Sequence, residues 1–359
     1  DVIVEKKYET KVLFPNDTSC DMGFDIFSAV FFMVSRYEEY LPFIPDRYGR
    51  YNATDTLAYK NNFLHIPLVD IWIDLFRSIL QKKFPSIEFG ASSFNAIVTY
   101  DIDVAYKFKG RSFNKMAGAT IKDLLKFNLK NIYNRIQTLS NNQRDPWDVY
   151  DYLQETIVQN KLDSIFFFLL SDASIHDRNL NYKNPLVKSL IGTIKFFSEI
   201  GIHPSYPTSS FPEKISTEKK RLEKLSGKII YKSRQHYLKF ILPETYNSLL
   251  EAGITEDYSM GFSDMHGFRA GTSKPFYFYD LKNETATRLK IFPVTFMEGS
   301  FINSKRSKEN ILQDIYQLID EVKKVNGTFI SIWHNHTVSN TDEYSDWRNI
   351  HNKMILALL

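Results

Sequence analysis

Two aspartates one residue apart, Asp101 and Asp103, follow an apolar run that ends at Tyr100. The β-branched and aromatic residues from Phe94 to Tyr100 predict a buried strand, and side chains at positions i and i+2 of a strand end face the same side. Both carboxylates should therefore face one pocket. Like charges held so close repel each other unless a cation lies between them or one of them takes a proton. The pair indicates cation binding or proton transfer, although an Asp-rich turn is the simpler interpretation of such a pair alone.

Further polar residues stand at the ends of three other predicted strands, and they are His203, Arg234 with His236, and His334 with His336. In folds built from β-α units, catalytic groups gather at the carboxyl ends of the strands. Asp103 and His203 together predict an oxygen-and-nitrogen site for a divalent metal, of the kind that Zn²⁺ accepts.

Three residues suit the chemistry beside such a metal. Asp101 is placed to take a proton from water, and His334 to protonate a leaving amine. Arg234 is a natural partner for the carboxylate pair. For His203 a turn position, and for His334 a core position, are the structural alternatives.

The predicted elements alternate in a way that would bring these residues together. The predicted strands are 94–100, 164–170, 201–203, 228–233, 291–294 and 328–334. The predicted helices are 121–139, 147–160, 186–200, 212–225, 244–252 and 310–325. The all-apolar character of the strand at 164–170 suits a parallel sheet or barrel covered on both faces. This alternation predicts an α/β fold of β-α units, closed or nearly so.

The first part of the chain has a different pattern. Residues 1–92 are predicted to form a smaller accessory domain of α+β type, and residues 93–359 the barrel domain, with a linker at 90–93. In the accessory domain the predicted elements are strands at 2–4 and 11–14, a turn at Asn16-Asp17, and helices at 24–40 and 69–82.

Composition narrows the function classes. The 45 basic and 42 acidic residues are mixed along the chain, with no basic footprint for nucleic acid. Cys20 is the only cysteine, so neither an intrachain disulfide nor a thiolate metal cluster is possible. The apolar stretches are too short to span a bilayer, so no transmembrane segment is expected. A cytoplasmic location is expected, with an exported or membrane-peripheral protein as the alternative.

From about residue 94 onward, the order of these motifs resembles the NodB-homology polysaccharide deacetylases, a carbohydrate-esterase family of metal-dependent N-deacetylases. Residues 99–103 (T-Y-D-I-D) are similar to the family's T-F-D-D, with one residue inserted between the carboxylates. The resemblance implies that Asp101 is the catalytic base and that Asp103 is a metal ligand.

The second family motif, H-[ST]-x-x-H, is matched only at His203, because Pro207 stands where the second metal-binding histidine is expected. Proline cannot bind a metal. Either water or another side chain completes the site, or the metal is held weakly, and the candidate side chains are Ser205, His236 and His336.

The third motif, R-P-P-Y, is similar to residues 234–237 (R-Q-H-Y). The resemblance implies that Arg234 orients the base and that the backbone amide of Tyr237 helps to hold the oxyanion. His236 occupies a position where the family has proline, which makes it the first candidate for a replacement ligand.

The last two motifs are matched unequally. The fifth, an aliphatic strand that ends in histidine, is similar to residues 329–334 and assigns the acid role to His334. The fourth, an Asp before Trp, has no good match, and Arg269 occupies its neighbourhood. Residues expected to contact the substrate are Arg269, Tyr206 and Trp333.

Together the resemblance implies a distorted (β/α) barrel preceded by a smaller domain, as in a group of uncharacterised bacterial relatives. It implies a hydrolase that removes N-acetyl groups from an amino sugar of a bacterial polysaccharide or its precursor. One divalent metal is expected, Zn first, with Co, Ni or Mn as alternatives, and a carbohydrate as substrate. The alternatives are a glycan-binding or assembly protein, which Pro207 favours, and a metal-independent hydrolase of C–N bonds.

Overall fold

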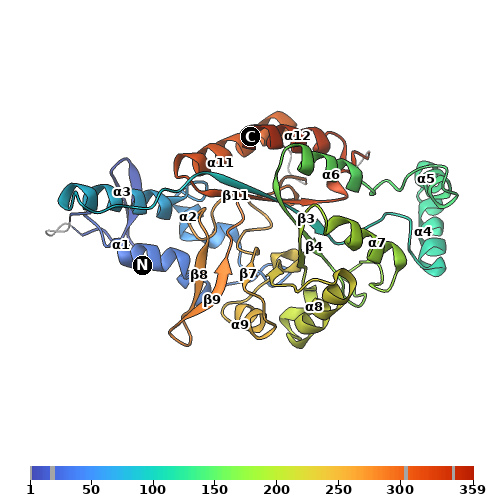
Figure 1. Ribbon diagram of the computed structural model, residues 1–359, viewed down its shortest axis with the longest axis horizontal. Helices are drawn as coiled ribbons and strands as arrows, with labels where there is room; N and C mark the ends of the chain where they lie inside the picture. Colours follow the sequence, from blue (N-terminus) through green and yellow to red (C-terminus); the bar gives the residue numbers. More distant parts are fainter. Residues whose placement is uncertain (1, 17–20, 303–305, 342–343) are drawn as a thin grey trace.

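The central feature is a nine-stranded sheet in the order β10-β11-β3-β4-β5-β6-β7-β9-β8 (Figure 1). The computed structural model describes residues 2–16, 21–302, 306–341 and 344–359, so Asp17 and Cys20 lie outside the described residues. The strands are β3 Asn95–Ile102, β4 Asp163–Phe168, β5 Glu199–Ile202, β6 Lys232–Ser233, β7 Glu256–Asp257, β8 Phe276–Asp280, β9 Thr285–Ile291, β10 Phe296–Met297 and β11 Thr328–His334.

Neighbouring strands are parallel except for the antiparallel pair β8 and β9. Strands β10 and β8 stand at the two ends of the order, so within the described residues the barrel does not close. The predicted fold class, α/β with a distorted (β/α) barrel, is confirmed.

Helices follow most of the strands, as expected for β-α units. They are α4 Phe113–Leu125, α5 Leu129–Leu139, α6 Tyr150–Gln159, α7 Pro185–Ile194, α8 Glu213–Ser226, α9 Glu244–Glu251, α10 Gly299–Ile302, α11 Lys308–Lys324 and α12 Trp347–Leu358. Local signals set several ends: Asn184 caps α7 ahead of Pro185, and Gly227 ends α8 with a left-handed φ of 70°. In the part of the chain that the structure describes, no helix has the length and apolarity needed to cross a membrane.

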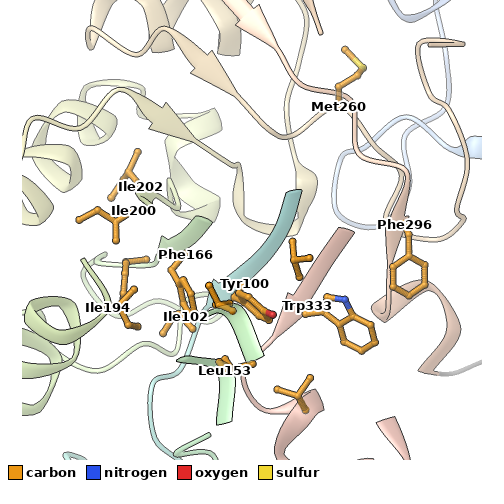
Figure 2. Packing of buried hydrophobic residues seen from close by; sticks show 14 of the residues in the cluster. Tyr100, Ile102, Leu153, Phe166, Ile194, Ile200, Ile202, Met260, Phe296 and Trp333 are labelled. Atoms are coloured by element: carbon orange, nitrogen blue, oxygen red, sulfur yellow. The ribbon is translucent and has the colours of Figure 1, made fainter. Parts of the chain in front are cut away.

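The two faces of the strands bury different clusters. Tyr100, Ile102 and Phe166 lie in the larger cluster, packed under the outer helices (Figure 2). Ile165 and Phe167, which alternate with Phe166 on β4, lie in a smaller cluster on the other face. Because successive side chains of a strand point to opposite faces, Asp101 is turned to the face of the smaller cluster and away from Tyr100.

The first part of the chain forms its own cluster. A hairpin of β1 Val4–Lys7 and β2 Thr10–Leu13 packs with α1 Ile26–Val34 and α3 Leu68–Lys83, and α2 is the short helix Leu57–Lys60. Trp72 is fully buried there, and its Nε1 donates to the Lys11 carbonyl at 2.8 Å. The predicted domain boundary at residues 92 and 93 stays a prediction.

Two predicted helices are interrupted. The helix expected at 24–40 ends at Val34, and Arg36 takes a left-handed φ of 56° before a 3₁₀ turn at Tyr37–Tyr40. The Arg36 guanidinium binds Glu38 and Glu39 within that turn, at 2.8 Å each. The helix expected at 121–139 is the pair α4 and α5, broken where Phe127 has a left-handed φ of 52°.

Other differences concern strands. The helix expected at 186–200 ends at Ile194, and residues 199–202 form β5 instead. The strand expected at 291–294 is wrong, because the strand ends at Ile291, two residues before Pro293, which has no N–H to donate to a ladder. Strand β8 and helix α12 were not predicted.

Candidate active site

A cavity of about 310 Å³ lies where β3, β5, β6 and β11 end. Parallel pairing sets His334 of β11 opposite Asp101 of β3, which brings the two strand ends into register. The cavity is lined by seven of the residues predicted from the sequence, namely Asp101, Asp103, His203, His236, Tyr237, His334 and His336. Segments more than 200 residues apart in the chain thus build one site.

Asp103, His203 and His236 form a group with the geometry of a metal site. One ligand atom from each lies within 4.8 Å of the others. His203 Nε2 is 3.2 Å from Asp103 Oδ1, and His236 Nε2 is 3.6 Å from Asp103 Oδ2. Two imidazoles and one carboxylate match the ligand types of a catalytic zinc site with an open position.

The outer nitrogens of both rings are already bound. His203 Nδ1 donates to the Arg234 carbonyl at 2.5 Å, and His236 Nδ1 donates to Asp177 Oδ1 at 2.8 Å. Such contacts are typical of metal-binding histidines, because they fix the tautomer and direct the Nε2 lone pair inward.

With this tautomer, the atoms that face the centre of the group are acceptors, which a cation would stabilise. With the His203 proton on Nδ1, its Nε2 and Asp103 Oδ1 are two acceptors 3.2 Å apart. Asp103 Oδ1 is buried and has no hydrogen-bond partner among the described residues. A proton or a metal ion between these atoms would remove the repulsion, so the residues present fit a divalent metal.

The pKa values of Asp103 and His236 also indicate that the group favours positive charge. Burial alone would raise the pKa of Asp103, but the imidazoles, that of His236 above all, hold it well below its usual value. Burial would lower the pKa of His236, but the carboxylates of Asp103 and Asp177 raise it to about 9. The site therefore attracts positive charge.

Asp101 is held from behind by a buried arginine. Arg234 Nη1 donates to Asp101 Oδ1 at 2.9 Å and to Thr99 Oγ1 at 2.5 Å, and Nε donates to the Tyr258 carbonyl at 2.9 Å. Arg234 is fully buried, so it fixes the Asp101 carboxylate without lining the cavity. Asp101 Oδ2 lies 3.8 Å from His203 Nε2, beside the metal-site group.

His334 has a carboxylate partner that the sequence did not reveal. Glu298, fully buried after β10, accepts from both the backbone N (2.8 Å) and Nδ1 (2.7 Å) of His334, and from Thr337 Oγ1. Burial would lower the pKa of His334, but the charges of Glu298 and Asp103 raise it to about 10. His334 is therefore protonated at neutral pH, as a general acid requires.

The three candidate replacement ligands have different positions. His236 joins the metal-site group, as described above. Ser205 is buried outside the cavity lining, and its Oγ donates to Glu218 at 2.5 Å. His336 lines the cavity but lies outside the group, and burial together with the His334 charge lowers its pKa to about 4.

The three expected substrate contacts do not line the cavity. Trp333 is fully buried in the larger cluster (Figure 2). Successive side chains of a strand alternate between its faces, so Trp333 points away from the face of its neighbour His334. Arg269 is buried against Glu39, with 2.9 Å from Nε to Oε1. The Tyr206 hydroxyl donates to the Tyr48 carbonyl at 3.1 Å, and its ring lies against that of His176, with the centroids 4.0 Å apart and the planes tilted by 31°.

Residue 50 of the amino-terminal part reaches the cavity as well. Arg50 lines it and donates from Nη1 to the Tyr237 carbonyl at 2.9 Å, while Asp46 accepts from Arg50 Nε at 2.8 Å. Tyr237 has a left-handed φ of 63°, an uncommon conformation that is typical of functional sites. No periodic pattern marks the segment around Arg50, so the sequence alone did not reveal this contact.

Comparison with known proteins gives three results. Residues 1–85 match a family of unknown function (DUF7033). No curated protein matches the chain by sequence. Among solved structures, the chain is similar to a Mycobacterium smegmatis protein assigned as a polysaccharide deacetylase (11% identity, 75% of this chain and 86% of that chain, TM-score 0.47). It is also similar to the polysaccharide deacetylase Bc1974 from Bacillus cereus (11% identity, 74% and 86% of the two chains, TM-score 0.39).

Proposed function

We propose that the protein is a metal-dependent hydrolase that removes N-acetyl groups from an amino sugar of a bacterial polysaccharide or its precursor. The observation that carries this proposal is the convergence of three arrangements on one cavity of about 310 Å³. They are the metal-site group of Asp103, His203 and His236, the Asp101–Arg234 pair, and the His334–Glu298 pair.

Asp103, His203 and His236 would hold the metal. A divalent ion there, Zn²⁺ first, would polarise the acetamide carbonyl and activate water as a Lewis acid. Asp101, fixed by Arg234, accepts the proton of the attacking water. His334, kept protonated by Glu298, gives a proton to the nitrogen of the leaving amine, and the acetate and the free amine separate.

The other cavity residues suit the substrate. Leu238, Met297 and Ile302 line the same cavity and provide apolar surface that an acetyl methyl group can contact. Tyr237 also lines the cavity, and its backbone amide is proposed to donate to the carbonyl oxygen as negative charge develops. The choice of an N-acetylated sugar is supported by the order of the sequence motifs.

Metal binding is the first test. The protein is stripped with chelator and titrated with Zn²⁺ by calorimetry, beside Asp103→Ala, His203→Ala and His236→Ala. One equivalent in the parent and loss in all three variants are expected. His176→Ala is the matched control, because His176 lies near Tyr237 but outside the metal-site group.

Hydrolysis is the second test. Acetate release from N-acetylglucosamine oligomers is measured with the Zn²⁺-loaded parent and with Asp101→Asn, which should be inactive while it retains metal. A parent that binds no metal, or a His236→Ala variant that binds it as the parent does, would overturn the proposed site.

The alternative of a glycan-binding protein without catalysis was favoured by Pro207. His236, from a neighbouring strand end, reaches the position that a third ligand needs, which supports the enzyme over this alternative. Metal-free hydrolysis would be revealed by acetate release that survives both chelation and the His236→Ala change.

A further inference from the structure

The helical hairpin of α4 and α5 has an inverted distribution of side chains. It stands at one end of the long axis of the molecule, opposite α1 and α3 (Figure 1). No residue of α4 is buried, and the buried residues of α5 are Arg135 and Thr138. A helical hairpin in water normally buries apolar residues and exposes polar ones.

Polar bonds join the two helices. Arg135 Nη1 donates to Thr120 Oγ1 at 2.8 Å, and Arg135 forms an ion pair with Asp123. Asn131 Nδ2 also donates to Asp123 Oδ2, at 2.7 Å. The side-chain hydrogen bonds and the ion pair between α4 and α5 are therefore made by charged, amide and hydroxyl groups.

Large apolar side chains cover the outside. Phe127, between the helices, is 88% exposed, Phe113 84% and Leu125 77%. Six more apolar residues of the hairpin are at least half exposed, namely Ile121, Leu124, Leu129, Tyr133, Ile136 and Leu139. Leu129, Tyr133 and Ile136 recur at helical spacing and so form one stripe along α5. An exposed apolar surface of this extent marks an interaction site.

The positive charge of residues 107–139 indicates what kind of partner binds the apolar surface. Residues 107–139 contain eight lysines and arginines, and Asp123 is their single acidic residue. The chain as a whole has a formal net charge of only +3, so the excess is local, and the expectation that basic and acidic residues are mixed along the whole chain does not hold for this segment. Because Asp123 is paired with Arg135, it does not offset the charges of Lys115, Lys122 and Lys126. A second copy of this surface would be repelled by it, whereas an anionic lipid surface would attract it.

We propose that the α4–α5 hairpin docks the protein on the surface of an anionic lipid bilayer. Phe127, Leu125 and the stripe on α5 enter the interface between headgroups and acyl chains, and Lys122 and Lys126 contact the anionic headgroups. The hairpin lies in the interface without spanning it, in line with the lengths of α4 and α5.

The test is co-sedimentation of the full chain with vesicles of phosphatidylcholine, alone or with about 30% phosphatidylglycerol. Binding to the anionic vesicles, weak binding to the neutral ones and loss at high salt are expected. The pair Leu125→Ser with Phe127→Ser removes apolar surface, and the pair Lys122→Glu with Lys126→Glu reverses charge. Each should lower the bound fraction at least about tenfold.

Control variants outside the hairpin show whether any loss of binding is specific to the hairpin. Phe196→Ser removes an equally exposed aromatic, 84% exposed, away from the hairpin. The pair Lys220→Glu with Lys224→Glu on α8 repeats the charge reversal at the same spacing. Both should bind as the parent does, and circular dichroism should show all variants folded.

Three outcomes would overturn the proposal. They are no binding by the parent, equal binding to neutral and anionic vesicles, and unchanged binding by the hairpin variants. Sedimentation velocity without lipid gives a further check. A dimer that the Leu125→Ser and Phe127→Ser pair abolishes would make a second copy the occupant of this surface instead.

Discussion

His236 is bound to Asp177 through a hydrogen bond of 2.8 Å between Nδ1 and Oδ1. Because this bond uses the outer nitrogen of the ring, Nε2 is left to face Asp103. Asp177 is itself fully buried and also accepts from the Tyr206 backbone amide at 3.0 Å. A carboxylate outside the metal-site group thus sets the direction of His236, the proposed third metal ligand.

Asp177→Asn should therefore weaken Zn²⁺ binding by about 10- to 100-fold, the usual cost of losing an outer partner of a ligating histidine. Competition with a chromophoric chelator measures this change. Asp172→Asn is the control, because Asp172 is an exposed carboxylate paired with Arg221 at 2.9 Å. An Asp177→Asn variant with the parent's affinity would show that His236 does not bind the metal.

Glu298→Gln should separate catalysis from metal binding. The neutral amide stabilises the protonated His334 less than the carboxylate does, so acetate release should fall by about 100-fold or more while the metal content stays at the parent's level. Glu256→Gln, a carboxylate bound to Lys232 outside the cavity, should leave the rate unchanged. A Glu298→Gln rate equal to the parent's would remove His334 from the acid role.

Glu39→Ala should destabilise the fold strongly. Glu39 is buried between Arg36 and Arg269, and their charges outweigh burial and hold its pKa below the usual value. Its loss leaves two buried guanidinium groups without their shared carboxylate, which should cost about 3–5 kcal/mol in the free energy of unfolding.

Urea unfolding measures the Glu39→Ala effect. Glu244→Ala removes an exposed carboxylate that lies 3.5 Å from Lys282, and should change the free energy of unfolding by about 0.5 kcal/mol or less. Similar losses in the free energy of unfolding would mean that the buried ion pairs of Glu39 stabilise the fold no more than an exposed ion pair does.

His351 should make stability depend on pH. It is fully buried, with ring nitrogens 3.0 Å from the Tyr100 hydroxyl and 2.7 Å from the Tyr152 hydroxyl, and burial lowers its pKa to about 3. An unfolded histidine titrates near 6.5, so the unfolded chain binds a proton that the folded chain rejects. The contribution of neutral His351 is complete above about pH 6.5 and is lost progressively as the pH falls toward 3.

Between pH 7.5 and 5.0 this loss should be about 2 kcal/mol. Urea unfolding at the two pH values measures it in the parent and in His351→Gln, which cannot titrate. The variant should lose less stability than the parent over this range by that amount. Parallel losses in both proteins would mean that His351 accepts a proton in the folded state.

The sequence predicted the parts of the fold that have strong local signals. The apolar runs that form β3, β4 and β11 are long and bounded by polar residues. Asp101 and His334 are the first polar residues after two of these runs, so their positions at strand ends could be predicted. Strand β7 has two residues, too few for any periodicity. The antiparallel strand β8 was not predicted, although its aromatic run is of the kind that favours a strand.

Some residues of the candidate site were not predicted, because they too have no strong local signal in the sequence. Glu298 follows a strand of two residues, and Asp177 and Arg50 lie outside regular elements, so only tertiary contacts bring Arg50 to the cavity and the two carboxylates to His334 and His236. Trp333 is a different case. Strict alternation along β11 already sets Trp333 and His334 on opposite faces, so the sequence pattern was sufficient to exclude Trp333 from the cavity.

The ion pair of Glu39 with Arg269 also constrains how such chains diverge. Replacement of either residue alone leaves a buried charge without this partner. The two positions, 230 residues apart, should therefore vary together among related sequences. A relative that lacks the segment matching residues 1–85 should have lost the arginine at 269 as well, which a collection of homologous sequences can show without any purified protein.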